Sequence, residues 1–338
     1  MLIRTTLLPS VLIFSPRDTE AVYGLILRLL QDLGKTGVIL VDDEQCIYNA
    51  FSQRFDRWPG NYNKFKKKAQ VLLKELDKKN RIVLAPLQGE VSSKCSDKSC
   101  QYCIKIAEDY LPIAVLARQN CNLCAKKQVA HLPTVRVIDV DEYTIDDAFC
   151  SLLYPHDRVF DHGEEEQHKF EQEILIPLFR DAKHVKIYDR YIGRSILQKN
   201  ADNYKLALEW ILEVFVRESR KPNFFEVYSG CRTQSHPNQL PRDTSRDEAA
   251  LRQLETDMKK IFPGFKLIVK NETYNKQLPH DRYLVTNQVA VSVGRGFDLL
   301  LDKRSSLYPR RLRDVHINYC SEHGKIEQAV RWLPDLYS

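Results

Sequence analysis

The sequence predicts an α/β protein, in which an N-terminal parallel α/β sheet with an inserted zinc-binding module is followed by a second α/β domain. Short runs of continuous apolar residues alternate with amphipathic helical segments, which is typical of parallel sheets buried on both faces. Two CxxC pairs interrupt this alternation in the first half, and an acidic, polar stretch at 157–167 separates the halves. We therefore place the domains at 1–155 and 165–338, with the four-cysteine module at about 95–125.

The elements of the first domain follow its apolar runs. Expected strands are 9–14, 37–42, 81–86 and 134–140, and expected helices are 18–33 and 62–80. Gly34 supports the end of the first helix, since glycine is common just past a helical C-terminus. The second helix is rich in lysine, and its basic side either contacts a phosphate backbone or is an ordinary solvated face.

The second domain repeats the alternation. Expected helices are 167–180, 204–217 and one that starts at 245, and expected strands are 184–192, 224–228, 265–269, 283–286 and 289–293. Ser245 is the expected N-cap of the third helix, and Glu248 completes a capping box three residues later.

Composition indicates a globular protein with a core. The chain has 338 residues, 43% of them hydrophobic, and a formal net charge of +6, which permits phosphate-rich partners without requiring them. We expect no transmembrane segment, because no apolar run approaches the roughly 18 residues that cross a bilayer. The first residues also lack the pattern of a signal peptide, so we expect a cytoplasmic protein.

The cysteines predict a metal site. An odd total of nine with two CxxC pairs favours metal in a reducing compartment over disulfides. Cys100 and Cys103, then seventeen residues, then Cys121 and Cys124 fit the spacing of a structural Zn²⁺ site with four thiolate ligands. A closed thiolate shell has no open position for substrate, so such a site would stabilise the fold. Cys95 and, more weakly, His131 are reserve ligands, and unrelated buried and surface cysteines are the alternative.

A possible phosphate site lies near the C-terminus. His280 and Arg282 are two residues apart on an expected strand, so their side chains share a face. Asn287 follows five residues later, and the turn Gly294-Arg295-Gly296 comes soon after, with backbone amides that can approach a phosphate. The alternative is a structural histidine, with an internal ion pair that holds the turn.

This spacing resembles the HxK-x4-D signature of the phospholipase D superfamily, with Arg282 in place of lysine and Asn287 in place of aspartate. The resemblance implies that His280 attacks phosphorus to form a phosphohistidine without a metal, while Arg282 and Asn287 hold the phosphate, helped by Gly294, Arg295 and Gly296. The carboxamide of Asn287 could orient the histidine but would not stabilise an imidazolium as a carboxylate would.

The order of elements from 166 to 319 also resembles the phospholipase D-like domain found C-terminal to MIT domains. That family is known as a dimeric domain that binds acidic membranes and lacks evident hydrolase activity. Prokaryotic relatives include defence and restriction nucleases that dimerise to bring two histidines together. The resemblance therefore implies a homodimer through the C-terminal domain, and a place beside partner proteins of a multi-gene defence system.

Acidic residues after the N-terminal strands give a further candidate site. They are Asp18, Glu20, Asp42, Asp43, Glu44, Asp139, Asp141 and Glu142. Carboxylates at the carboxyl ends of parallel strands can hold Mg²⁺ or Mn²⁺, which loosely resembles a PIN-type nuclease. Helix capping and solvated loops are the alternative, and they explain most of these residues.

The leading expectation is therefore a phospholipase D-like nuclease that cleaves nucleic acid with His280. One alternative is a catalytically silent module that binds the phosphates of nucleic acid or an acidic membrane. The other is a metal-dependent nuclease that uses the N-terminal carboxylates.

Overall fold

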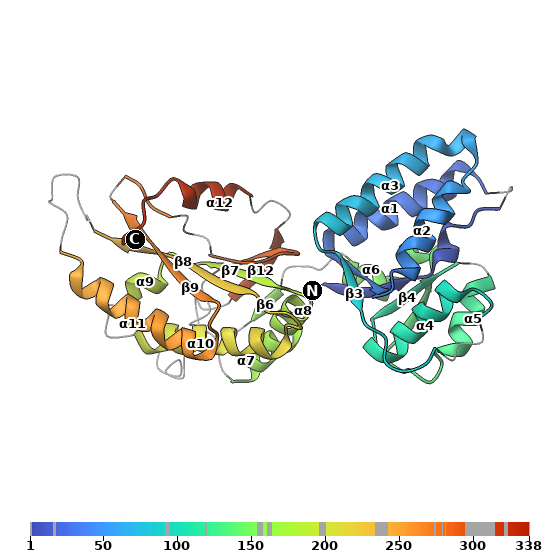
Figure 1. Cartoon of the computed structure of the whole chain (residues 1–338). Helices are drawn as coiled ribbons and strands as arrows, with labels where there is room; N and C mark the ends of the chain where they lie inside the picture. Colours follow the sequence, from blue (N-terminus) through green and yellow to red (C-terminus); the bar gives the residue numbers. More distant parts are fainter. Residues whose placement is uncertain are drawn as a thin grey trace. The chain divides into compact units, whose positions relative to one another are not determined.

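The computed structural model describes residues 2–15, 18–91, 95–118, 120–153, 158–160, 164–195, 201–233, 243–273, 275–278, 280, 282–294, 315–320 and 324–337. The chain divides into two compact units, unit 1 (Met1–Pro155) and unit 2 (His156–Ser338). Each unit is built around one sheet, as Figure 1 shows.

Unit 1 contains a five-stranded sheet in the order β3-β2-β1-β4-β5. Its strands are β1 (Ile3–Leu7), β2 (Gly37–Asp42), β3 (Ile82–Ala85), β4 (Ala114–Ala117) and β5 (Arg136–Asp139). All four pairings are parallel. The strand order reverses between β1 and β4, so loops diverge there and ligands bind at such points in open α/β sheets.

Helices cover both faces of the sheet of unit 1. They are α1 (Glu20–Thr36), α2 (Cys46–Asp56), α3 (Asn63–Lys78), α4 (Lys98–Tyr110), α5 (Asn120–Gln128) and α6 (Asp147–Leu153). In Figure 1, α1 and α3 lie on one side of the sheet and α4 and α5 lie on the other. This two-sided cover explains why β2 and β4 are buried along their whole length.

The first strand differs from the prediction. Residues 9–12 form a short 3-10 helix, η1 (Pro9–Leu12), and β1 precedes it. Two threonines made β1 look polar, yet both are fully buried. The Thr5 hydroxyl donates to the Val38 carbonyl at 3.2 Å, and the Thr6 hydroxyl donates to the Leu40 carbonyl at 3.5 Å. Pairing with β2 therefore satisfies polar groups that the sequence pattern counts against a strand.

The expected cysteine module is not an insertion. Residues 95–125 form α4, β4 and the beginning of α5. β4 pairs with β1 on one side and with β5 on the other, so this segment supplies part of the centre of the sheet. The prediction of a separate module is wrong because a four-residue strand between two cysteine pairs is too short to stand out in the sequence.

Unit 2 contains a seven-stranded mixed sheet in the order β6-β12-β11-β10-β7-β8-β9. Its strands are β6 (Arg158–Phe160), β7 (His184–Tyr188), β8 (Phe224–Arg232), β9 (Phe265–Glu272), β10 (Arg282–Thr286), β11 (Ala290–Val293) and β12 (Val315–Cys320). β7, β8 and β9 are parallel to one another, whereas the other pairings are antiparallel. The carboxyl ends of β7 to β9 therefore lie at the edge where β10 begins.

The helices of unit 2 are unequally distributed over its sheet. They are α7 (Glu164–Phe170), α8 (Ile176–Phe179), α9 (Ile192–Ser195), α10 (Ala201–Glu218), α11 (Ser245–Ile261) and α12 (Gly324–Arg331), and a π-helical turn, η4 (Glu171–Leu175), joins α7 to α8. Figure 1 shows α12 on one face of the sheet and α7, α10 and α11 on the other. The N-cap of α11 is Thr244, with Ser245 inside the helix, and the Thr244 hydroxyl donates to Glu248 Oε1 at 3.1 Å.

The face that carries the larger helices holds much of the core, including Phe215 of α10 against Phe225 of β8. The face under α12 has a smaller apolar cluster that includes Tyr188, Val285 and Val330. Within the described residues, no helix has the length and apolar character needed to cross a membrane.

Candidate active site

Two pairs of an arginine and a carboxylate meet at the carboxyl edge of β7 to β9. Asp189 directly follows β7, and its Oδ2 lies 3.4 Å from Nε of Arg282, the first residue of β10. Glu272 ends β9, and its Oε1 lies 2.9 Å from Nε of Arg190. Asp189 is 1% exposed and Glu272 is fully buried. Burial of both acids at one strand edge requires cationic partners, and the two arginines supply them.

Tyr191 links the arginines to the predicted nucleophile. The guanidinium of Arg282 lies over its ring, 4.7 Å from the centroid. The His280 ring meets the same ring at 5.5 Å in an edge-to-face arrangement. His280 is exposed, whereas Arg282 is buried. The prediction that these two side chains share one site therefore agrees with the geometry, although His280 precedes β10 and does not lie on it.

The backbone around these pairs is closely packed. The backbone amide of Tyr191 donates to Asp189 Oδ1 at 2.8 Å, and the Ser229 hydroxyl donates to the Asp189 carbonyl at 2.7 Å. A Cβ atom on Gly230 would lie 2.5 Å from Cδ of Glu272, so only glycine lets the end of β8 pass this carboxylate. These contacts hold Asp189 and Glu272 in place before any ligand arrives.

The ion pair between Asp189 and Arg282 is buried but is not aligned as a hydrogen bond. Burial raises the pKa of the Asp189 carboxyl, while the positive charges of Arg282 and His280 act in the opposite direction. A separation of 3.4 Å is longer than the roughly 2.7–2.9 Å of a strong charge-assisted hydrogen bond. In the described part of the chain, Asp189 Oδ2 and Arg282 Nε accordingly have no hydrogen-bond partner. Both atoms are buried, so they form a close ion pair that is not aligned as a hydrogen bond.

Asn287 lies at the opposite end of β10 from His280. Its Oδ1 accepts hydrogen bonds from the backbone amides of Lys183 at 2.8 Å and His184 at 3.3 Å, where β7 begins. Five strand residues separate it from the site, which is about 17 Å at about 3.4 Å per residue. The structure therefore does not bring Asn287 to His280 and Arg282, and gives it a role in fixing the start of β7.

Of the predicted glycine-rich turn, the structure describes only the first residue, Gly294. The Gly294 carbonyl accepts a hydrogen bond from Arg282 Nη1 at 3.2 Å. Gly294 thus lies beside the site and holds the arginine through its carbonyl oxygen. Arg295 and Gly296 lie outside the described residues.

The four predicted zinc ligands lie on helices. Cys100 and Cys103 belong to α4, and Cys121 and Cys124 belong to α5. Burial raises the pKa values of the Cys100 and Cys103 thiols. Cys103 is fully buried, with Sγ 3.6 Å from the Leu7 carbonyl, and so points into the sheet. Among the described residues no group of three or more histidine, cysteine or acidic side chains is arranged to hold a metal. Cys103 as placed therefore points away from a centre shared with the other three, and zinc stays a prediction.

The N-terminal acids mostly have structural partners. Asp42 accepts the backbone amides of Cys46 and Ile47 at 2.7 and 2.8 Å, so it caps the start of α2. Asp18 and Asp141 both pair with the buried Arg118, each at 2.8 Å. Glu44 accepts a hydrogen bond from the Tyr102 hydroxyl, and Asp139 accepts one from Asn122. These carboxylates hold loops at the carboxyl edge of the sheet in unit 1. This is the interpretation in which the acids cap helices and hold loops, as opposed to binding a metal.

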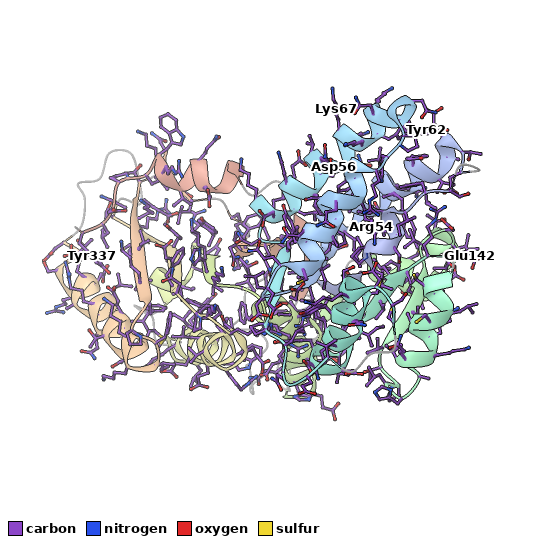
Figure 2. All side chains as sticks on the ribbon, turned by 45° about the vertical axis from the view of Figure 1, so that its right-hand side comes forward. Arg54, Asp56, Tyr62, Lys67, Glu142 and Tyr337 are labelled. Atoms are coloured by element: carbon purple, nitrogen blue, oxygen red, sulfur yellow. The ribbon has the colours of Figure 1, made fainter. Side chains whose placement is uncertain are left out.

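The basic helix is exposed as its composition suggests. The exposed lysines on and just after α3 are Lys64, Lys67, Lys68, Lys74, Lys78 and Lys79. In Figure 2 the side chain of Lys67 points away from the body of unit 1. Lys66 differs, since its Nζ lies 3.1 Å from Oδ1 of Asp56.

Sequence reasoning missed Glu272 and the bonding role of Asp189, Arg190 and Tyr191. The available signal was the run Asp189-Arg190-Tyr191 directly after the apolar strand β7, because polar groups at the carboxyl ends of parallel strands commonly face ligands.

No family model matches the chain, no curated protein matches it, and no solved structure matches it. The resemblance to phospholipase D-like domains therefore depends on the motif residues from His280 to Gly296 and on the order of elements.

Proposed function

We propose that unit 2 is a phosphodiesterase of the phospholipase D-like type that acts on nucleic acid, with His280 as its nucleophile. The observation that carries the proposal is the meeting of an exposed imidazole and a buried guanidinium on one tyrosine ring, Tyr191. This places a group that can attack phosphorus beside a fixed positive charge that can stabilise the phosphoryl oxygens.

The proposed reaction has two displacements. A ring nitrogen of His280 attacks phosphorus and the bond to the leaving oxygen breaks, while an acid donates a proton to that oxygen. Water then attacks the phosphohistidine and gives a proton to the acid that lost one in the first step, and the P–N bond breaks to regenerate His280. Arg282 stabilises the negative charge that develops on phosphorus oxygens in both steps. We propose that the acid is His280 of a second copy, so that the active protein is a homodimer through unit 2.

The test is cleavage of labelled single- and double-stranded DNA and RNA, with Mg²⁺ and with EDTA. Wild type is compared with His280→Ala and with His168→Ala, a matched control that removes an exposed histidine of α7 in the same unit. EDTA-resistant cleavage that only His280→Ala loses supports the proposal. Cleavage that persists in His280→Ala overturns it, and a requirement for Mg²⁺ in that variant would move the activity to the acids of unit 1.

A second candidate is a phosphate-binding module without catalysis. Two observations favour it: Arg282 is already engaged by Asp189 and Gly294, and Asn287 is remote from His280. Binding of DNA or RNA that His280→Ala weakens, without cleavage under any condition, would identify this function.

A further inference from the structure

A separate cavity of about 480 Å³ lies on the α12 face of unit 2. Strands β7, β8 and β9 provide its floor, α12 lines one side, and the segment around Tyr337 lines another. Arg252 of α11 stacks on the Tyr337 ring with its guanidinium 4.4 Å from the centroid, which closes the rim beside the edge strand β9. Tyr337 is labelled in Figure 2. The volume is within the range of about 300–1,000 Å³ that is usual for small-molecule sites.

Strand register explains the floor of this cavity. Tyr188, Tyr228 and Ile268 are aligned across β7, β8 and β9, and so share one face. The rings of Tyr188 and Tyr228 stack at 4.8 Å. Lys186, Glu226 and Lys266 form the next aligned row of the same face, and the Glu226 carboxylate accepts a hydrogen bond from the Tyr228 hydroxyl at 2.9 Å. The floor thus combines a flat, largely apolar surface with a row of two lysines and one glutamate at one side.

The charges that line the cavity do not cancel. Each of its three acids has a lysine partner: Glu327 pairs with Lys186, Asp335 with Lys270, and Glu255 with Lys259. Three lining cations have no acidic partner within the described part of the chain, and these are Lys266, Arg331 and Arg252. Lys266 and Arg331 are also exposed. An anion that enters would therefore meet unpaired positive charge.

This cavity is distinct from the site around His280. Successive residues of a strand point to opposite faces, so Tyr188 points to the α12 face while Asp189 points away from it. Asp189 instead lines a small cavity together with Ile192 and Ala207 of the opposite layer. A ligand on the tyrosine floor would therefore leave the Asp189–Arg282 pair untouched.

We propose that this cavity binds a phosphorylated organic molecule of mononucleotide size. Its planar part would lie on the Tyr228 and Ile268 surface, and its phosphate would be held by Lys266 and Arg331. A lone inorganic anion would use the cations but leave the apolar floor empty, whereas an uncharged nucleoside would leave the cations unpaired. Both parts of the ligand therefore contribute to the affinity.

The test is calorimetric titration of the full chain with AMP, with adenosine and with inorganic phosphate. We expect AMP to bind at least about tenfold more tightly than either fragment, because each fragment forgoes one set of contacts. The double variant Lys266→Ala/Arg331→Ala should lose about tenfold or more in affinity for AMP. Lys64→Ala, which removes an exposed lysine of unit 1, is the matched control and should bind AMP as wild type does.

Further variants separate this inference from the proposed active site and from misfolding. Lys266→Arg keeps the charge and should retain binding, whereas a fold defect in the double variant would show in circular dichroism. His280→Ala should bind AMP normally. The inference is overturned if AMP does not bind, if adenosine binds equally well, or if binding is lost in His280→Ala and kept in Lys266→Ala/Arg331→Ala.

Discussion

Asp189 and Arg282 are opposite one another because β7 and β10 are antiparallel with Tyr188 aligned to Tyr283. The acid follows the end of one strand and the arginine begins the other, which brings Oδ2 and Nε to 3.4 Å. One strand register thus sets the position of the arginine beside His280. Stability and activity should both depend on this pair.

Arg282→Ala should strongly destabilise unit 2. The substitution leaves the carboxylate of Asp189 buried without its cation, and breaking such a pair typically costs about 3–5 kcal/mol. Chemical denaturation would measure the free energy of unfolding. Asp189→Asn/Arg282→Met removes both charges and should be less destabilised than Arg282→Ala. If Arg282→Ala lowered the free energy of unfolding by less than about 1 kcal/mol, a structural role for the pair would be contradicted.

The stability lost in Arg282→Ala, measured as the free energy of unfolding, should increase as the pH rises. Burial raises the pKa of Asp189, and removal of the Arg282 charge raises it further. A carboxyl whose folded-state pKa exceeds its unfolded value favours folding when protonated, and that contribution is lost as pH rises through the folded pKa. Unfolding experiments from pH 4 to pH 8 should therefore show that the difference in free energy of unfolding between the variant and wild type increases with pH. Asp189→Asn in the same background should abolish this dependence, and a gap that narrows with pH would refute the explanation.

Tyr191 should matter through its ring and not through its hydroxyl. Both His280 and Arg282 contact the ring, so Tyr191→Phe should keep any phosphodiesterase activity within about threefold. Tyr191→Leu removes the flat surface and should lower kcat by about tenfold or more, because positioning of the nucleophile is lost. Steady-state kinetics on the best substrate would measure both variants. Equal activity of the leucine and phenylalanine variants would exclude this positioning role.

Asn287→Ala should affect stability without affecting chemistry. Loss of Oδ1 removes the acceptor for the amides of Lys183 and His184, which should cost about 1 kcal/mol. Asn287→Asp keeps an acceptor and should be closer to wild type. Cleavage or phosphate binding, measured below the unfolding transition, should be unchanged in both variants. A selective loss of activity in Asn287→Ala would restore the role that the sequence motif suggested.

Gly230→Ala should destabilise unit 2 by more than about 1 kcal/mol. The new Cβ would lie 2.5 Å from Cδ of Glu272, a group held by Arg190 at 2.9 Å. Gly24→Ala is a suitable control, because a Cβ atom added to this glycine of α1 would meet no neighbouring side chain within 4 Å, and alanine favours helices. Thermal unfolding of the two variants should show opposite shifts. A neutral Gly230→Ala would mean that Glu272 readily moves.

Local patterns determined much of the secondary structure. The apolar run at 37–42 predicted the bounds of β2 without error, and the lysine-rich helix was found within two residues at each end as α3. The first is a continuous apolar run and the second is strongly periodic, so the signal of each lies within a few neighbouring residues. His280 and Arg282 do meet on the Tyr191 ring, but His280 precedes β10, so the strand alternation behind the prediction does not explain their contact.

Tertiary structure decided the rest. The buried threonines of β1 and the four residues of β4 become strands only because neighbouring strands satisfy their backbone and side-chain groups. Spacing alone placed Asn287 in the site, whereas the fold sends it to the far end of β10 and brings Asp189 and Glu272 in its place. Sequence alone determined which residues could carry charge and chemistry, and strand register across distant segments determined which of them meet.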